Sequence, residues 1–146
     1  MIFFGVILGI AVLAYFLDSA TGAVNIVTGY FVNLSAAQIA QYASNAGFEG
    51  DDLVTAVAIA LAESSGNPGA VGDNGTSIGL WQIHYTVHPE FDSNQLTDPQ
   101  YNANSAYSLY SRRGNSFNDW STYTVEVNGV FPYTKYLDMA QAGVNG

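Results

Sequence analysis

Residues 51–65 read DDLVTAVAIALAESS, a segment that places one carboxyl group at the end of a long apolar run. An apolar stripe repeats here at helical spacing, formed by Leu53, Val54, Val57, Ala58 and Leu61. The alanines between these positions allow neighbouring elements to approach closely, and Asp51 and Asp52 are expected to cap the first turn. We therefore predict a helix that is buried on nearly all sides, within a mainly α-helical fold.

Glu63 is the one acidic residue between Asp52 and Asp73, and it closes the apolar stripe. A carboxyl group among apolar side chains has a raised pKa, because desolvation disfavours its charged form. Such a group can donate a proton at neutral pH, as a general acid must when a glycosidic bond breaks. A glutamate in the last turn of a helix is more commonly solvated, so its position alone is weak evidence for catalysis.

Cap and turn signals divide the rest of the chain into elements. Three further helices are predicted: one over 36–46 behind a Ser35–Gln38 capping box and ended by Gly47, one from Asp98-Pro99 to about Arg112 and ended by Gly114, and a last one opened by Phe131-Pro132 and closed by Gly143. Residues 66–79 contain five glycines and one proline, a composition typical of turns and a short hairpin. Functional residues often lie on such irregular segments.

Residues 2–17 (IFFGVILGIAVLAYFL) form an uninterrupted apolar run that Asp18 ends. As a helix this run would span about 24 Å, slightly less than the roughly 30 Å of a bilayer's hydrocarbon core. We predict a retained N-terminal transmembrane helix over 1–18, a linker over 19–34 and one domain over 35–146, with its orientation open because no Lys or Arg flanks the run. A cleaved signal peptide and a buried helix of a soluble fold are the alternatives.

Charge and composition exclude several classes of function. Three basic residues against twelve acidic ones give a net charge of -9, so the attraction that drives nucleic-acid binding is missing. The chain has no cysteine, which excludes disulfides, a thiolate nucleophile and cysteine-ligated zinc. His84 and His88 stand four residues apart, but Pro89 follows them and no adjoining Glu completes a metalloprotease motif. No metal and no cofactor are predicted, and Arg112 and Arg113 are expected to finish a helix.

Two segments carry a resemblance to a known superfamily. Residues 63–68 (ESSGNP) and 75–83 (GTSIGLWQI) resemble the linked signatures of lytic transglycosylases and goose-type lysozymes. In that superfamily a Glu-Ser pair ends a buried helix, and a Gly-x-Ser-x-Gly-Leu-x-Gln segment faces it across a sugar cleft. Further segments resemble lysozyme-like modules of phage tail proteins, namely 46–50, 56–62, 88–91, 98–102 and 117–123. The resemblance spans about residues 35–140.

The resemblance implies a lysozyme-like fold and a peptidoglycan lytic transglycosylase that cuts the bond between N-acetylmuramic acid and N-acetylglucosamine. Glu63 would then act first as general acid and later as base. The implied substrate-binding residues are Ser77, Gly79, Gln82 and Asn102, with Tyr133 or Tyr136 favoured over Tyr123 as the late tyrosine of the family. For Gly79 a packing role beneath the cleft is an equal alternative, and Asn102 could bond to backbone instead of sugar.

No second acid accompanies Glu63 in the motif, and Asp73 reads as a turn former. A single-acid mechanism fits better, in which the substrate's 2-acetamido group supports the cationic sugar carbon. The resemblance to lytic transglycosylases implies that Glu63 then deprotonates the 6-hydroxyl, giving a 1,6-anhydro end. Attack by water would make the same site a hydrolytic muramidase. A virion or envelope protein that binds glycan without cleaving it is the non-catalytic alternative. The expected partners are peptidoglycan glycan strands, a membrane, and other virion or envelope proteins. The expected location is a phage virion membrane or a bacterial cell envelope, with the domain outside the bilayer.

Overall fold

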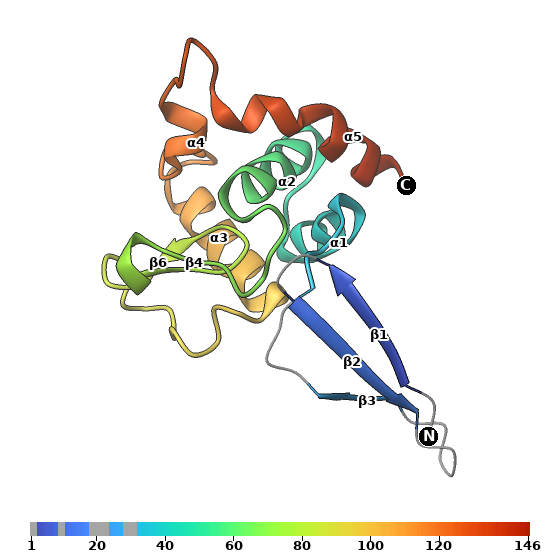
Figure 1. The fold of residues 1–146 in the computed structure, drawn as a ribbon. Helices are drawn as coiled ribbons and strands as arrows, with labels where there is room; N and C mark the ends of the chain where they lie inside the picture. The colour runs from blue at the N-terminus through green and yellow to red at the C-terminus, as the bar shows by residue number, and fades with distance from the viewer. Residues whose placement is uncertain (1–2, 9–10, 18–23, 28–31) are drawn as a thin grey trace. The chain divides into compact units, whose positions relative to one another are not determined.

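The computed structural model describes residues 3–8, 11–17, 24–27 and 32–146, and the chain divides into two compact units, Met1–Val32 and Asn33–Gly146. In the first unit, the strands are β1 (Phe3–Leu8), β2 (Ala11–Leu17) and β3 (Val24–Val27). They form an antiparallel sheet in the order β1-β2-β3 (Figure 1), with Phe3 opposite Phe16 and Leu17 opposite Val24.

The helix expected over residues 1–18 is not observed, because residues 3–8 and 11–17 are strands. The run is rich in Val, Ile, Phe and Tyr, which favour extended backbone. Strand β3 likewise lies inside the expected linker of residues 19–34, and the parts of that linker at 19–23 and 28–31 lie outside the described residues. In the described part of the chain, no helix has the length and apolar character needed to cross a membrane.

The second unit is mainly helical, as predicted. Its helices are α1 (Ala36–Ala46), α2 (Gly50–Ser64), α3 (Pro99–Arg112), α4 (Ser121–Thr124), the 3₁₀ helix η2 (Pro132–Tyr136) and α5 (Leu137–Asn145). Helix α2 packs against α1, α4, η2 and α5, so that it lies among the other helices in Figure 1. Every residue from Ala56 to Leu61 is buried, which confirms the predicted helix at the centre of the fold.

Of the three helices with a predicted N-terminal cap residue, α1 and α3 begin at that cap and α2 does not. Ser35 and Gln38 form the expected capping box at the start of α1, and Asp98 caps α3 by accepting a hydrogen bond of 2.7 Å from the Tyr101 backbone N–H. The predicted cap of α2 is wrong: Glu49 holds the N-cap position, and Asp51 and Asp52 lie in the first turn. There their negative charges are favoured by the helix dipole without any capping hydrogen bond.

The end of the chain differs from the single helix expected between Pro132 and Gly143. A 3₁₀ turn precedes α5, and α5 runs past Gly143 to Asn145. A Cβ atom placed on Gly143 would lie 2.6 Å from the backbone carbonyl carbon of Ala36 in α1. Gly143 is therefore the point where two helices approach closely, and it does not terminate α5.

A small antiparallel sheet follows α2. It consists of β4 (Val71–Gly72), β5 (Ser77–Ile78) and β6 (Ile83–His84), with the 3₁₀ turn η1 (Asp73–Gly75) between β4 and β5. Gly72 pairs with Ser77, and Ser77 pairs in turn with His84. The predicted hairpin within 66–79 is thus confirmed, and β6 extends it by a third strand.

Two tryptophans tie this sheet region to the helices on either side. The Trp81 indole N–H donates a hydrogen bond of 3.0 Å to the Ala56 carbonyl in the middle of α2. The Trp120 indole N–H donates one of 2.9 Å to the Trp81 carbonyl, just before α4 begins. Both indoles are nearly fully buried, at 0% and 5% exposure. The chain of bonds from α2 through Trp81 to Trp120 fixes α4 near the C-terminal half of α2.

Candidate active site

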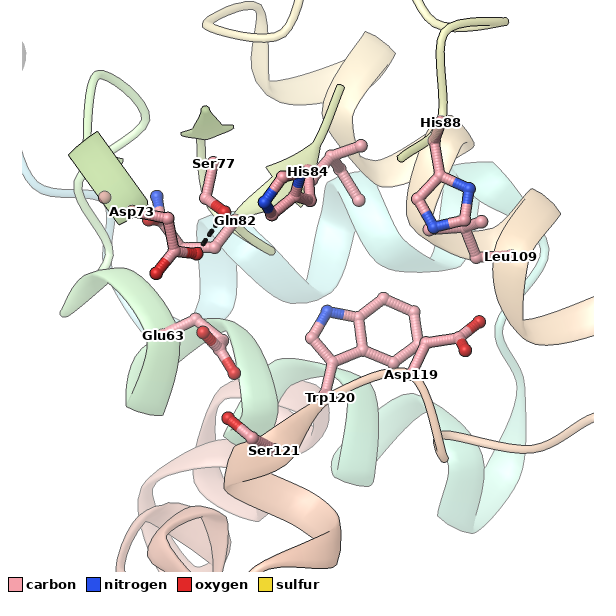
Figure 2. Close-up of a pocket in the computed structure, with 12 residues that line it drawn as sticks. Glu63, Asp73, Ser77, Gln82, His84, His88, Leu109, Asp119, Trp120 and Ser121 are labelled. Carbon is pink, nitrogen blue, oxygen red and sulfur yellow. Dashed lines mark hydrogen bonds between the residues drawn. The ribbon is translucent and has the colours of Figure 1, made fainter. Parts of the chain in front are cut away.

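A cavity of about 300 Å³ opens where the end of α2, the small sheet and the segment before α4 meet (Figure 2). Its lining residues are Glu63, Gly72, Asp73, Ser77, Gln82, Ile83, His84, His88, Leu109, Asp119, Trp120 and Ser121. Of the residues predicted from the sequence, Glu63, Ser77 and Gln82 are brought together in this cavity. The glutamate at the end of the buried helix therefore faces the motif that follows it in sequence.

The Glu63 carboxyl group is partly buried and accepts a hydrogen bond from a residue of α4. The Thr122 hydroxyl donates a hydrogen bond of 2.6 Å to Glu63 Oε1. Burial raises the pKa of Glu63 above its usual value, and the neighbouring Asp73 carboxylate adds to this rise, whereas the hydrogen bond from Thr122 lowers the pKa in part. The net result is a raised pKa, the property that a general acid working near neutral pH needs.

Asp73 has a second role beyond the turn that the sequence predicts. It begins η1 with a positive φ of 49°, and its carbonyl accepts a hydrogen bond of 2.7 Å from the Thr76 hydroxyl, as expected of a turn residue. Its carboxylate, however, lines the same cavity as Glu63 and accepts a hydrogen bond of 2.5 Å from the Ser77 hydroxyl. A second carboxylate therefore faces the cavity, which the motif alone did not indicate.

Ser77 and Gln82 line the cavity, but their polar groups are already engaged within the protein. Ser77 is only 2% exposed, and its hydroxyl holds Asp73. The Gln82 side-chain amide donates to the carbonyls of Ala70 at 3.1 Å and Gly79 at 2.9 Å. Both side chains therefore brace the loop that carries Asp73.

Gly79 and Asn102 do not line the cavity, contrary to the expected contact with sugar. Asn102 is fully buried: its oxygen accepts from the Trp81 backbone N–H at 2.9 Å, and its NH₂ group donates to the carbonyls of Ile78 and Leu96, each at 2.9 Å. A Cβ atom on Gly79 would lie 2.3 Å from the Asn102 amide nitrogen. In this structure Gly79 leaves the room in which Asn102 bonds to backbone.

The late tyrosines also lie outside the set of lining residues. Tyr133 and Tyr136 belong to η2, which packs on α2, and the rings of Tyr123 and Tyr133 lie 4.9 Å apart at an angle of 40°. Burial raises the pKa of Tyr133, and the neighbouring Tyr123 adds to the rise. In this structure these tyrosines hold η2 against its neighbours and do not reach into the cavity.

Sequence reasoning missed two residues close to Trp120. Asp119 lines the cavity, and Thr122 donates a hydrogen bond to the Glu63 carboxyl group. The motif of residues 117–123 pointed to this segment, but Thr122 fell on one of its variable positions. His84 and His88 both line the cavity. In the described ranges, no group of three or more His, Cys, Asp or Glu side chains is arranged to hold a metal ion.

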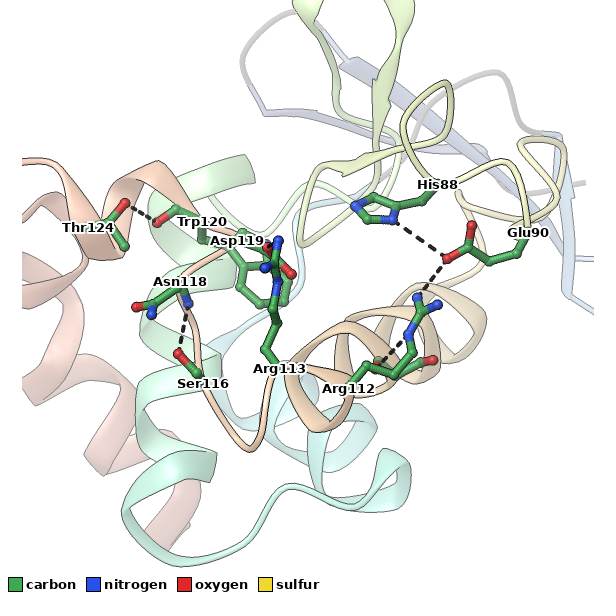
Figure 3. A network of polar contacts seen from close by, with 10 residues as sticks. His88, Glu90, Arg112, Arg113, Ser116, Asn118, Asp119, Trp120 and Thr124 are labelled. Atoms are coloured by element: carbon green, nitrogen blue, oxygen red, sulfur yellow. Dashed lines mark hydrogen bonds and ion pairs between the residues drawn. The ribbon is translucent and has the colours of Figure 1, made fainter.

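Ion pairs involve His88 and Asp119, two of the residues that line the cavity (Figure 3). Arg113 pairs with Asp119 at 2.7 Å, and Arg112 pairs with Glu90 at 2.7 Å, with His88 Nδ1 lying 3.6 Å from the same Glu90 oxygen. The Arg112 guanidinium is the main cause of a lowered pKa at Glu90. Both arginines do lie at the end of α3, as predicted, and each also neutralises a carboxylate near the cavity.

A mainly helical domain whose buried central helix ends in a glutamate, facing a small sheet across a cavity, has the architecture of a lysozyme-like protein. A family model described as a lysozyme-like domain matches residues 40–122, which is 83 of the 146 residues. The chain therefore belongs to the lysozyme-like domain family, within the superfamily of lysozymes and lytic transglycosylases. The match includes Glu63, the whole small sheet, α3 and Thr122. No curated protein and no solved structure matches the chain.

Proposed function

We propose that this protein is a peptidoglycan lytic transglycosylase in which Glu63 is the catalytic acid and base. Membership of the lysozyme-like family supports cleavage of peptidoglycan in general. The observation that carries the specific assignment is the Glu63 carboxyl group, which lines a cavity at the end of a buried helix and has a raised pKa. A carboxyl group whose pKa is raised in such a place is suited to giving a proton to a glycosidic oxygen.

In the proposed reaction, Glu63 gives its proton to the glycosidic oxygen between N-acetylmuramic acid and N-acetylglucosamine as the bond to the sugar carbon breaks. The carbonyl oxygen of the 2-acetamido group supports the positive charge that develops on that carbon. Glu63, now ionised, removes the proton of the 6-hydroxyl, whose oxygen closes the 1,6-anhydro ring. Glu63 is thereby reprotonated for the next cycle, and no water is consumed.

Hydrolysis is the second candidate, and Asp73 is the observation that favours it. Glycosidases that use water commonly place two carboxyl groups around the scissile bond. The Asp73 carboxylate lines the cavity with Glu63 and is held by Ser77, so it could orient a water molecule. Mass spectrometry of digested cell walls distinguishes the two reactions, because an anhydro end and a reducing end differ in mass by one water.

The experiment that tests the proposal is a gel assay with embedded peptidoglycan, run on the wild type and on Glu63→Gln. We expect clearing by the wild type and a loss of at least about 100-fold in Glu63→Gln, which is the lower range for removal of a general acid. Glu126→Gln is the matched control, because this exposed glutamate lies outside the cavity and should leave clearing intact. Equal clearing by wild type and Glu63→Gln would discredit the acid. Clearing by neither would favour a protein that only binds glycan.

We also propose a membrane setting, with the virion membrane of a phage preferred over a bacterial cell envelope. The support is the apolar run at residues 2–17 together with the sequence resemblance to phage modules. There the enzyme would open the wall locally, next to other virion or envelope proteins. Fractionation of cells that express the full chain tests the attachment: recovery in the aqueous fraction after mild salt washing would contradict it.

A further inference from the structure

The helix α4 has only four residues, yet its position next to Glu63 is fixed from the core. The preceding residue, Trp120, is held by its indole N–H on the Trp81 carbonyl, and Trp81 is held in turn by α2. Thr122 comes two residues later and is partly buried. Its hydroxyl thus reaches a residue 59 positions earlier in the chain from a rigid support.

The hydrogen bond joins Thr122 Oγ1 to one particular carboxyl oxygen of Glu63, at 2.6 Å. This distance is at the short end for a hydroxyl donor and a carboxyl acceptor. When Glu63 is protonated, the oxygen that accepts from Thr122 is the carbonyl oxygen. The proton then resides on the other oxygen, Oε2.

We propose that Thr122 is a positioning residue for Glu63, which fixes the carboxyl group through Oε1 and leaves the acidic proton on Oε2 to face the substrate. The inference rests on the proposed function, because it assigns a task to the same acid. It adds a residue from a part of the chain that the Glu-Ser motif does not include.

The contact also suits the second half of the proposed reaction. A hydrogen bond from a hydroxyl is stronger to a carboxylate than to a neutral acid. The Thr122 bond therefore strengthens once Glu63 has given its proton to the leaving oxygen, and it offsets part of the desolvation of the ionised form. Thr122 then holds the carboxylate in place while Oε2 takes the proton of the 6-hydroxyl.

The first test measures the contact without relying on activity. Carbon-13 NMR follows the titration of the Glu63 side-chain carboxyl in the full-length protein and in three variants: Thr122→Val, Thr122→Ser and Thr124→Val. Thr122→Val keeps the shape but loses the donor, so the pKa of Glu63 should rise, and Thr122→Ser should return it toward the wild type. Thr124→Val is the matched control, since the Thr124 hydroxyl bonds to the Trp120 carbonyl and should not affect Glu63. An unchanged midpoint in Thr122→Val would overturn the inference.

The second test measures the pH profile of kcat/KM on peptidoglycan. In Thr122→Val the alkaline limb should move to higher pH, and kcat should fall roughly 10-fold to 100-fold with little change in KM, because misplacement of a reacting group affects mainly the chemical step. Thr122→Ser should recover most of kcat. If Thr122→Val keeps the wild-type kcat and profile, the positioning role is wrong. If the wild type cleaves no peptidoglycan but the NMR midpoint still moves, the contact stands and the proposed function fails.

Should Thr122→Val fold poorly, as judged by its thermal melting curve, Thr122→Ala replaces it in both tests. This smaller side chain also lacks the donor and cannot crowd the helix α4. The same shifts are expected, and the same absence of a shift would overturn the inference.

Discussion

The Glu63 carboxyl group is subject to two charged or polar neighbours that act in opposite directions. Asp73, on the turn η1, raises the pKa of Glu63 beyond the effect of burial, and the hydroxyl of Thr122 lowers it. These neighbours come from two separate segments that both follow α2 in the sequence. The window of pH in which Glu63 is protonated therefore depends on how the sheet and α4 are held, in addition to the helix that carries the acid.

This balance predicts the effect of Asp73→Asn on the pH dependence of activity. The substitution removes a negative charge, so the ionised form of Glu63 becomes less unfavourable and its pKa falls toward the usual value. A general acid is active while protonated, so the alkaline limb of kcat/KM should move to lower pH. The direction is opposite to that expected for Thr122→Val. Steady-state rates measured from about pH 4 to pH 9 test it.

Asp51→Asn is the control for this comparison, because Asp51 lies in the first turn of α2, at the opposite end of the helix from Glu63. The pH profile of kcat/KM in Asp51→Asn should match that of the wild type. An alkaline limb that stays in place in Asp73→Asn would show that the two carboxyl groups do not interact. Complete loss of activity over the whole pH range would instead favour a direct part for Asp73 in hydrolysis.

At the scale of elements, the sequence predicted those helices that carry their own local signals. The Ser35–Gln38 capping box and the Asp98-Pro99 pair each act within a few residues, so α1 and α3 begin where expected. The helix α4 has no capping side chain and only four residues, and its place depends on a bond between Trp120 and the distant Trp81. No local pattern could reveal this element or the position of Thr122.

The Asn102 side chain joins α3 to the small sheet, and its replacement separates a structural role from sugar binding. In Asn102→Ala, the Trp81 N–H and the carbonyls of Ile78 and Leu96 lose their buried partner. We expect a loss of roughly 3 kcal/mol or more in the free energy of unfolding, because each buried polar group left without a partner costs about 1–3 kcal/mol. Urea unfolding measures it. If Asn102→Ala lost activity at unchanged stability, Asn102 would instead be a substrate-binding residue.

The contact between α5 and α1 predicts that Gly143→Ala lowers stability, whereas helix propensity alone would predict a gain. Replacing a glycine inside a helix by alanine ordinarily stabilises the helix by about 1 kcal/mol. At Gly143 the added Cβ would lie 2.6 Å from a backbone atom of Ala36, which cannot move aside cheaply. Gly143→Ala should therefore destabilise the protein by about 1–3 kcal/mol, the usual range for overpacking.

Thermal melting tests this contact. Gln141→Ala, on an exposed position of the same helix, is the control and should change stability by no more than about 0.5 kcal/mol. A higher melting temperature for Gly143→Ala would mean that the two helices can move apart at little cost, and that Gly143 is not needed for their approach.

At the scale of the whole molecule, the linked motifs placed Glu63, Ser77 and Gln82 at one site, the last two as substrate-binding residues, but they did not indicate Asp73, Asp119 or Thr122. Glu63, Ser77 and Gln82 lie within 20 positions of one another, so a sequence pattern can contain them all. Asp119, Trp120 and Thr122 reach the same place only through folding. Tyr133 and Tyr136, which the resemblance favoured, lie outside the lining residues, and the packing of η2 and the contact between Tyr123 and Tyr133 decide where they lie.

Charge is a property of the entire chain that bears directly on its substrate. The net charge is -9, and three carboxyl groups, those of Glu63, Asp73 and Asp119, line the cavity. Arg113 neutralises only Asp119 among them, through an ion pair of 2.7 Å. Bacterial wall polymers are themselves anionic, so long-range forces oppose the approach of this protein to its proposed substrate. Binding must depend on short-range hydrogen bonds and packing.

This repulsion predicts that salt should accelerate the cleavage of intact walls. Raising the ionic strength from about 10 mM to about 150 mM shortens the screening length from roughly 30 Å to roughly 8 Å, which removes most of the repulsion at a distance and leaves the contacts inside the cavity. We expect kcat/KM on anionic walls to rise several-fold over this range. With a short oligomer of alternating N-acetylglucosamine and N-acetylmuramic acid, made uncharged by amidation of its carboxyl groups, kcat/KM should stay nearly constant. Turbidity clearing and oligomer cleavage, measured at one pH, provide the two rates. A fall in the rate on anionic walls alone would contradict the repulsion and point to electrostatic attraction at the site. Arg112 and Arg113 would then be the residues to replace, because these two cations lie beside the cavity.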